Sequence, residues 1–184
     1  MKQTEILIGS PRKSGNTSYL SKYLSDLLNV SGTSASLTYL YDYEVKPCVD
    51  CRSCKKNDLR CVLDDDANLL YEKMENANVI VFGTPIYWFG TTAKMKLLID
   101  RLRPYFVNKK LAGKNGAVIL SAGSGAGDCD LTVEMFKRIF RTLEINFIGN
   151  VLSQSYNAGD AIADRDAINN IEQLSYQIMK TGIK

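Results

Sequence analysis

The chain contains 184 residues with a formal net charge of +3, and it has no histidine. That length suits one domain, residues 1–184, with a substantial core. The absence of histidine excludes Ser-His-Asp triads, histidine metal sites and histidine acid–base catalysis. The charge is small and scattered, and the apolar runs are too short for a membrane span or a signal peptide. We therefore expect a cytoplasmic protein that binds neither nucleic acid nor membranes.

The first expected strand, 6–8, runs directly into a segment rich in glycine and serine, 9–18, which precedes a helical pattern. Unpaired amides and the helix dipole make such a helix start favourable for an anion. Gly9 and Gly15 allow a close backbone approach, Pro11 fixes a bend, and Arg12 offers a fork suited to phosphate. The short side-chain donors around them are Ser10, Ser14, Asn16, Thr17 and Ser18. The segment predicts a phosphate site, the alternative being a turn that only caps the helix.

Two familiar nucleotide loops are excluded by the spacing. Five residues separate Gly9 from Gly15, where a Walker loop has four, and Asn16 occupies the place of its lysine. The segment also lacks the G-x-G-x-x-G of a dinucleotide fold.

The remaining elements alternate between helix and strand. In chain order we expect a helix over 19–28, a strand over 35–41, a cysteine-bearing loop over 47–66, a helix over 68–75, a strand over 79–82, a loop over 84–90, a helix from 91 or 92 to about 103, a strand over 117–120, a glycine-rich loop over 121–128, a helix around 135–143, a strand over 145–152 and a helix from about 160.

Five strands alternating with helices predict an α/β fold, a three-layer α/β/α arrangement around a five-stranded parallel sheet. Such sheets bind ligands beyond the carboxyl ends of the strands, where the strand order reverses. In the order 2-1-3-4-5, the loops after the first and third strands flank that reversal. The segments 9–18 and 84–90 should therefore form one site.

The second of these loops has its own signals. Pro85 favours an extended Thr84 and fixes its own turn, which should leave the following amides free for a ligand. Tyr87 and Trp88 could pack on a ring. The alternative is that the apolar side chains here, Ile86 and Phe89 above all, belong to the core.

With Gly-Ser-Pro-Arg-Lys-Ser-Gly-Asn-Thr-Ser at 9–18 and Thr-Pro-Ile-Tyr-Trp-Phe-Gly at 84–90, the chain resembles the flavodoxin-like NAD(P)H-dependent FMN reductases over essentially its whole length. The resemblance implies FMN, with its phosphate held by the first loop, its isoalloxazine along Pro85, Ile86, Tyr87, Trp88 and Phe89, and its other side bordered by Ser121, Ala122 and Gly123. It also implies a homodimer or a dimer of dimers. The chemistry would lie on the flavin, so no side chain is assigned a catalytic role.

A cysteine-rich loop, 47–66, carries Cys48, Cys51, Cys54 and Cys61 with two, two and six residues between them. Four thiolates this close could hold a four-iron cluster, and the motif resembles that of iron–sulfur flavoproteins. Zinc and metal-free thiols stay open as alternatives, whereas a disulfide framework does not suit the cytosol. The fifth cysteine, Cys129, is expected to pack in the core.

Charges near these motifs receive no functional assignment. We read 64–66, three aspartates, as a helix cap. The charges on the helix after the second loop, Arg101 among them, are expected to be solvated or paired.

The leading hypothesis is an FMN-dependent NAD(P)H oxidoreductase that reduces a flavin, a quinone or a similar small acceptor. The alternative is an iron–sulfur flavoprotein that exchanges single electrons with a ferredoxin-like partner. A third class is a binding module that uses the fold without turnover. No motif identifies the acceptor or distinguishes NADH from NADPH.

Overall fold

The computed structural model describes residues 2–56 and 59–181. It contains a five-stranded parallel sheet in the order β2-β1-β3-β4-β5, which confirms the predicted order. The strands are β1 (Gln3–Ile8), β2 (Ser34–Tyr39), β3 (Val79–Pro85), β4 (Asn115–Ala122) and β5 (Asn146–Gln154).

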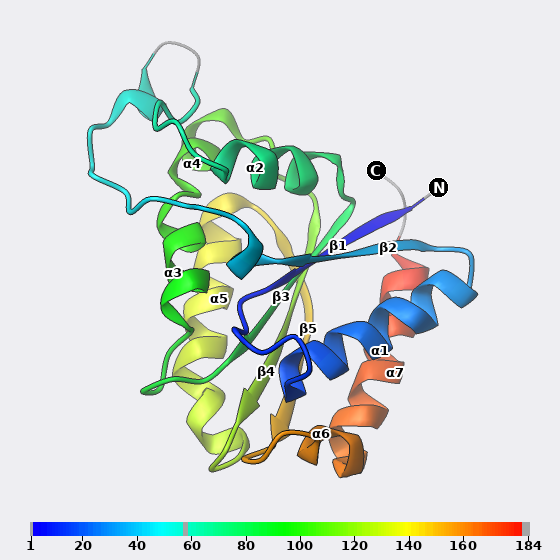
Figure 1. Cartoon of the computed structure of the whole chain (residues 1–184). Helices are drawn as coiled ribbons and strands as arrows, with labels where there is room; N and C mark the ends of the chain where they lie inside the picture. The colour runs from blue at the N-terminus through cyan, green and yellow to red at the C-terminus, as the bar shows by residue number, and fades with distance from the viewer. Residues whose placement is uncertain (1, 57–58, 182–184) are drawn as a thin grey trace.

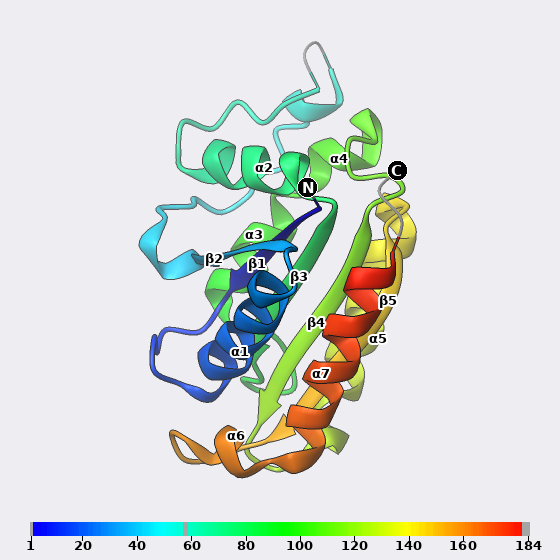
Figure 2. The same ribbon diagram turned by 90° about the vertical axis from the view of Figure 1, so that its right-hand side faces the viewer.

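Helices cover both faces of the sheet (Figures 1 and 2). One layer contains α1 (Asn16–Val30) and α7 (Arg165–Lys180), and the other contains α2 (Ala67–Asn76), α3 (Ala93–Asp100), α4 (Arg103–Asn108) and α5 (Asp130–Leu143). The short α6 (Asp160–Ala163) lies beyond the carboxyl end of β5. None of the helices in the described part of the chain is long and apolar enough to cross a membrane.

Alternation along the strands divides the core between these two layers. In β1, Ile6 and Ile8 face α1 and α7, whereas Leu7 faces the opposite layer. On that second side Phe82 packs against Phe136 and Phe140 of α5, with ring centroids 5.3 and 5.7 Å away. Burial on both faces explains why the strands read as nearly continuous apolar runs.

The expected single helix from 91 or 92 to about 103 is wrong at its end. Thr92 does cap α3, since its Oγ1 accepts from the Met95 amide at 3.3 Å. The helix stops at Asp100, however, and α4 begins at Arg103 with Pro104 in its first turn. Proline has no amide to donate and is tolerated only in that first turn, so it favours a new helix over a continuous one.

The final helix is likewise divided. Asp164 separates α6 from α7, where its carboxylate accepts from the Ala167 amide at 3.0 Å and from the Gln154 amide at 3.0 Å. This one residue caps α7 and fixes the end of β5.

Candidate active site

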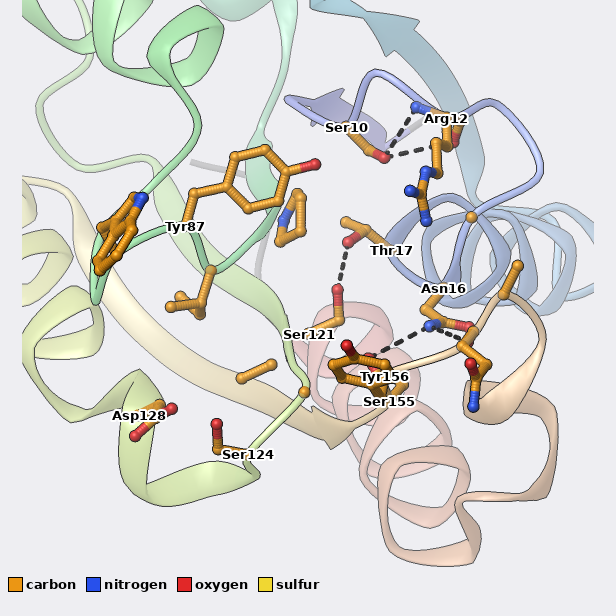
Figure 3. A pocket seen from close by; sticks show the side chains of 18 of the residues that line it. Ser10, Arg12, Asn16, Thr17, Tyr87, Ser121, Ser124, Asp128, Ser155 and Tyr156 are labelled. Atoms are coloured by element: carbon orange, nitrogen blue, oxygen red, sulfur yellow. Dashed lines mark hydrogen bonds between the residues drawn. The ribbon is translucent and has the colours of Figure 1, made fainter.

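The segment 9–18 forms the predicted loop between β1 and α1. Gly15 is the N-cap of α1 and supplies no side-chain cap, which leaves the first amides of the helix available to an anion. Ser10 Oγ accepts from the Arg12 amide at 3.2 Å, and the Arg12 side chain extends along the wall of a pocket (Figure 3).

Two serines that the sequence predicted as phosphate donors, Ser14 and Ser18, do not line the pocket. Ser18 is buried, and its hydroxyl donates to the Arg12 carbonyl at 2.8 Å, so it stabilises the backbone of the loop. Ser14 is exposed and is not among the residues that line the pocket. Of the predicted set, the structure places Ser10, Arg12, Asn16 and Thr17 at the pocket.

Close packing explains the first glycine of this loop. A Cβ on Gly9 would lie 2.8 Å from Met95 Cβ on α3, and the Gly9 amide donates to the Gly83 carbonyl at 2.7 Å. A side chain here would separate the first loop from β3 and α3.

The Asn16 side chain is already used in a network across the pocket. Its Nδ2 donates to the carbonyls of Ser155 and Asn157 at 3.4 and 2.8 Å. Its Oδ1 accepts from the amides of Gly159 and Ala161 at 2.9 and 3.3 Å. These bonds use the full capacity of the amide group, and they tie the start of α1 to the segment between β5 and α6.

The second loop leaves β3 at Pro85 and closes in a tight turn. The amides of Tyr87 and Gly90 donate to each other's carbonyls at 2.9 and 3.2 Å, and the Ile86 amide donates to the Ser121 carbonyl at 2.8 Å. The expectation that the amides after Pro85 stay free for a ligand is therefore wrong for Ile86 and Tyr87. They instead fix the loop to itself and to β4.

The two central residues of this turn have bulky side chains and left-handed backbone conformations. Trp88 has φ 51° and Phe89 has φ 63°, which is the geometry for which hairpin turns prefer Asn-Gly. Their side chains are 95% and 56% exposed, so they are not core residues. Left-handed aromatic residues are costly and cluster at functional sites. The turn thus holds aromatic rings at the pocket rim at the expense of stability.

This conformation can be tested by giving the turn its preferred sequence. The double change Trp88→Asn and Phe89→Gly should raise the free energy of unfolding of the ligand-free protein by about 1–2 kcal/mol, measured by chemical denaturation. The control, Trp88→Ala with Phe89→Ala, removes the rings but keeps side chains at left-handed positions and should give no gain. Equal stabilisation of both variants would show that the backbone conformations of Trp88 and Phe89 are not strained.

The third predicted group, Ser121, Ala122 and Gly123, lies at the end of β4 and lines the same pocket. Ser121 Oγ lies 2.6 Å from Thr17 Oγ1, which joins β4 to the start of α1 (Figure 3). A Cβ on Gly123 would lie 2.8 Å from the Tyr156 ring. Only glycine at 123 lets this ring rest on the β4 loop.

The structure adds a fourth segment that the sequence analysis missed, Ser155–Ala158 after β5. Tyr156 lies across the pocket from Tyr87 (Figure 3) and is 80% exposed. The segment follows the last strand, so its position at the carboxyl edge was a usable signal. It carries no motif that would have singled it out.

These four segments enclose a cavity of about 670 Å³ at the carboxyl edge of the sheet. One end offers Arg12 and the helix start, and the other offers aromatic rings and backbone. Asp128 is the one carboxylate among the lining residues. The cavity therefore suits a long ligand with an anionic end and a planar end.

The cysteine-rich loop lies elsewhere. It extends from the end of the molecule that carries α2 and α4, opposite the end with α6 (Figures 1 and 2), and none of its residues lines the cavity. Cys54 is buried, Cys51 is exposed, and Cys48 and Cys61 are half-buried. Within residues 2–56 and 59–181, no three cysteine, histidine or acidic side chains are gathered as metal ligands. The pKa of the Cys54 thiol is raised by burial and by the nearby thiols of Cys61, Cys48 and Cys51.

Two further expectations about this region have clear outcomes. Cys129 is fully buried in the core as predicted, and burial raises the pKa of its thiol to about 11. The aspartates cap α2 only in part, because Asp65 accepts from the Ala67 amide at 3.0 Å while the Asp66 carboxylate accepts from the Glu44 amide.

Comparison with known proteins gives a family match over most of the chain. The sequence model of the family described as NADPH-dependent FMN reductase matches residues 4–158. This range contains all four segments of the cavity and ends at Ala158.

Two relatives agree with that match, and one solved structure shares the fold. An iron-sulfur flavoprotein of Methanocaldococcus jannaschii is 30% identical over 77% of this chain and 73% of its own. YwqN of Bacillus subtilis, named as an NAD(P)H-dependent FMN-containing oxidoreductase, is 31% identical over 92% of this chain and 94% of its own. The structure of the Trp repressor binding protein from Bacillus subtilis superposes with a TM-score of 0.71 at 24% identity and covers 94% of this chain and 99% of that one.

Proposed function

Because the chain belongs to the NADPH-dependent FMN reductase family, we propose that it oxidises NADH or NADPH and reduces a flavin, a quinone or a similar small acceptor in the cytoplasm. The observation that carries this proposal is the single cavity in which a helix start with Arg12 faces the aromatic loop 85–89. The end with Arg12 and the aromatic end of this cavity match the phosphate and the ring system of a flavin mononucleotide.

The residues present fit FMN. Arg12, Ser10 and the first amides of α1 would hold the phosphate, because charge-assisted bonds and a helix start both favour a dianion. The loops 85–89 and 121–123 would lie along the two sides of the ring system. Bound FMN supplies the redox chemistry, accepting a hydride from a nicotinamide and passing electrons onward.

The protein's own contribution is binding, orientation and access. The bond between the Ile86 amide and the Ser121 carbonyl fixes the distance between the two ring-side loops. The exposed Tyr156 and Trp88 border the open side of the cavity. The substrates would meet the flavin there, one after the other.

The proposal includes a homodimer or a dimer of dimers. Its support is the exposure of Trp88 and Phe89 at the cavity rim, since apolar rings this exposed are typical of interaction surfaces. No role for nucleic acid or membranes is included.

A second candidate is an iron–sulfur flavoprotein that exchanges single electrons with a ferredoxin-like partner. It is favoured by the four cysteines of one loop and by the name of the Methanocaldococcus relative. The thiols of Cys61, Cys48 and Cys51 lie within electrostatic reach of Cys54. Because no three of them are gathered as metal ligands among the described residues, the loop would have to draw its sulfurs closer together to hold a cluster.

One sample distinguishes the candidates. Protein purified without oxygen should show flavin absorption bands, and with NADH or NADPH it should reduce quinones or free flavins. Iron and acid-labile sulfide are measured on the same sample. Flavin and turnover without iron support the reductase, whereas about four irons per chain support the second candidate. Protein that neither contains nor binds FMN would refute both.

A further inference from the structure

Arg101 is unlike the other charged residues near α3. Lys96 and Asp100 form an exposed pair on the helix, as predicted. Arg101 immediately follows α3 and is only 2% exposed. A guanidinium is rarely buried unless several acceptors compensate for its lost hydration, so its contacts indicate what the burial achieves.

In the described part of the chain, the hydrogen bonds of its guanidinium all go to residues in or beside the cysteine-rich loop. Arg101 Nη1 donates to the Lys46 carbonyl at 2.8 Å, just before the loop begins. The two terminal nitrogens donate to the two carboxylate oxygens of Asp65 at 2.5 and 3.1 Å, near its end. Nη2 also donates to Cys61 Sγ at 3.2 Å. One side chain thus contacts the start, the end and one sulfur of the loop.

Asp65 completes the closure from the other side. Its carboxylate accepts from the Lys46 amide at 2.9 Å as well as from the Ala67 amide. Its side chain and that of Arg101 are each 1% exposed. Burial alone would raise the pKa of Asp65, but the bonds from Arg101, Lys46 and Ala67 outweigh it and hold that pKa below its ordinary value.

We propose that Arg101 is a positioning residue that, with Asp65, closes the base of the cysteine-rich loop and fixes Cys61 against the junction of α3 and α4. The loop is then held at both ends by one buried ion pair. This assignment stands whether or not the loop takes up a metal.

The geometry requires arginine. Its planar fork meets both carboxylate oxygens and still reaches a carbonyl and a sulfur, whereas lysine offers a single point of charge. Arg103 provides a matched comparison, because it pairs with Asp50 of the same loop at 2.9 Å but is 39% exposed. Exposed pairs contribute little.

Amide hydrogen exchange of the FMN-saturated protein tests the proposal. In Arg101→Lys the amides of Lys46 and Ala67 should exchange about tenfold faster or more, since bonds to a buried charge are lost. The control Arg103→Lys should leave them unchanged. FMN affinity should stay within about twofold in both variants, because neither residue lines the cavity. Unchanged amide exchange in Arg101→Lys would overturn the proposal. A fall in FMN affinity by the same factor as the rise in exchange rate would also overturn it, because the variant would then have disturbed the whole domain.

The wild-type protein provides a second test that holds even when the variant does not fold. Its Lys46 and Ala67 amides should exchange far more slowly than those of the loop residues Val49 and Arg52. Equal exchange would show that the base of the loop is not closed and would overturn the proposal. Loss of FMN binding in the wild type would refute the proposed function while leaving this comparison intact.

Discussion

Arg12→Ala is expected to weaken FMN binding by roughly 10- to 150-fold, because a hydrogen bond to a charged group contributes about 1.5–3 kcal/mol. Arg12 lies at the end of the cavity formed by the start of α1, where the N-cap Gly15 adds no side-chain contact of its own. The remaining amides and Ser10 would still bind phosphate, so the loss should be partial. Affinity is measured by the quenching of flavin fluorescence.

Riboflavin, which lacks the phosphate, provides the decisive comparison. Its affinity should be the same in Arg12→Ala and in wild type, because the ring-side loops are unchanged. Ser14→Ala is the matched protein control, since Ser14 lies on the same loop but outside the cavity. A parallel loss of riboflavin affinity would show that Arg12 supports the shape of the site and does not contact phosphate.

The sheet could be predicted because its signals are local. Apolar runs such as Val79–Phe82 are buried on both faces, and the helices between them show their own periodicity. The loops after β1 and β3 could be assigned to one site because parallel strands end at one edge. The strand order itself was an inference from the fold class, because a single sequence does not show which strands are neighbours.

The contacts that the sequence did not reveal are long-range and polar. Arg101 meets Asp65 and Lys46 from 36 and 55 residues away, so the expectation that it is solvated or paired named neither its partners nor its burial. The left-handed Trp88 is equally hidden, because propensity predicts asparagine or glycine in such a turn. For Arg101 tertiary contacts decide the position, whereas the turn at Trp88 is closed by its own hydrogen bonds between Tyr87 and Gly90 against the local preference.

Asn16 is a second residue whose long-range contacts the sequence did not reveal. Its position in the first loop predicted that it binds phosphate. In the structure its side chain bonds to residues 139 to 145 positions away, in the segment that carries Tyr156 and at the adjoining start of α6. Phosphate could be contacted by this side chain only if some of these bonds were broken. The geometry therefore favours a role in holding the fourth segment against α1.

Asn16→Ala should consequently weaken FMN and riboflavin binding by the same factor, about tenfold. The segment 155–158 and the adjoining start of α6 lose bonds of about 0.5–1.5 kcal/mol each, so this wall of the cavity is no longer held in place. Fluorescence titration with both flavins measures this directly. A loss confined to FMN would instead make Asn16 a phosphate ligand. Because Arg12→Ala should affect FMN alone, the two variants together separate the residue that binds the anion from the residue that shapes the cavity.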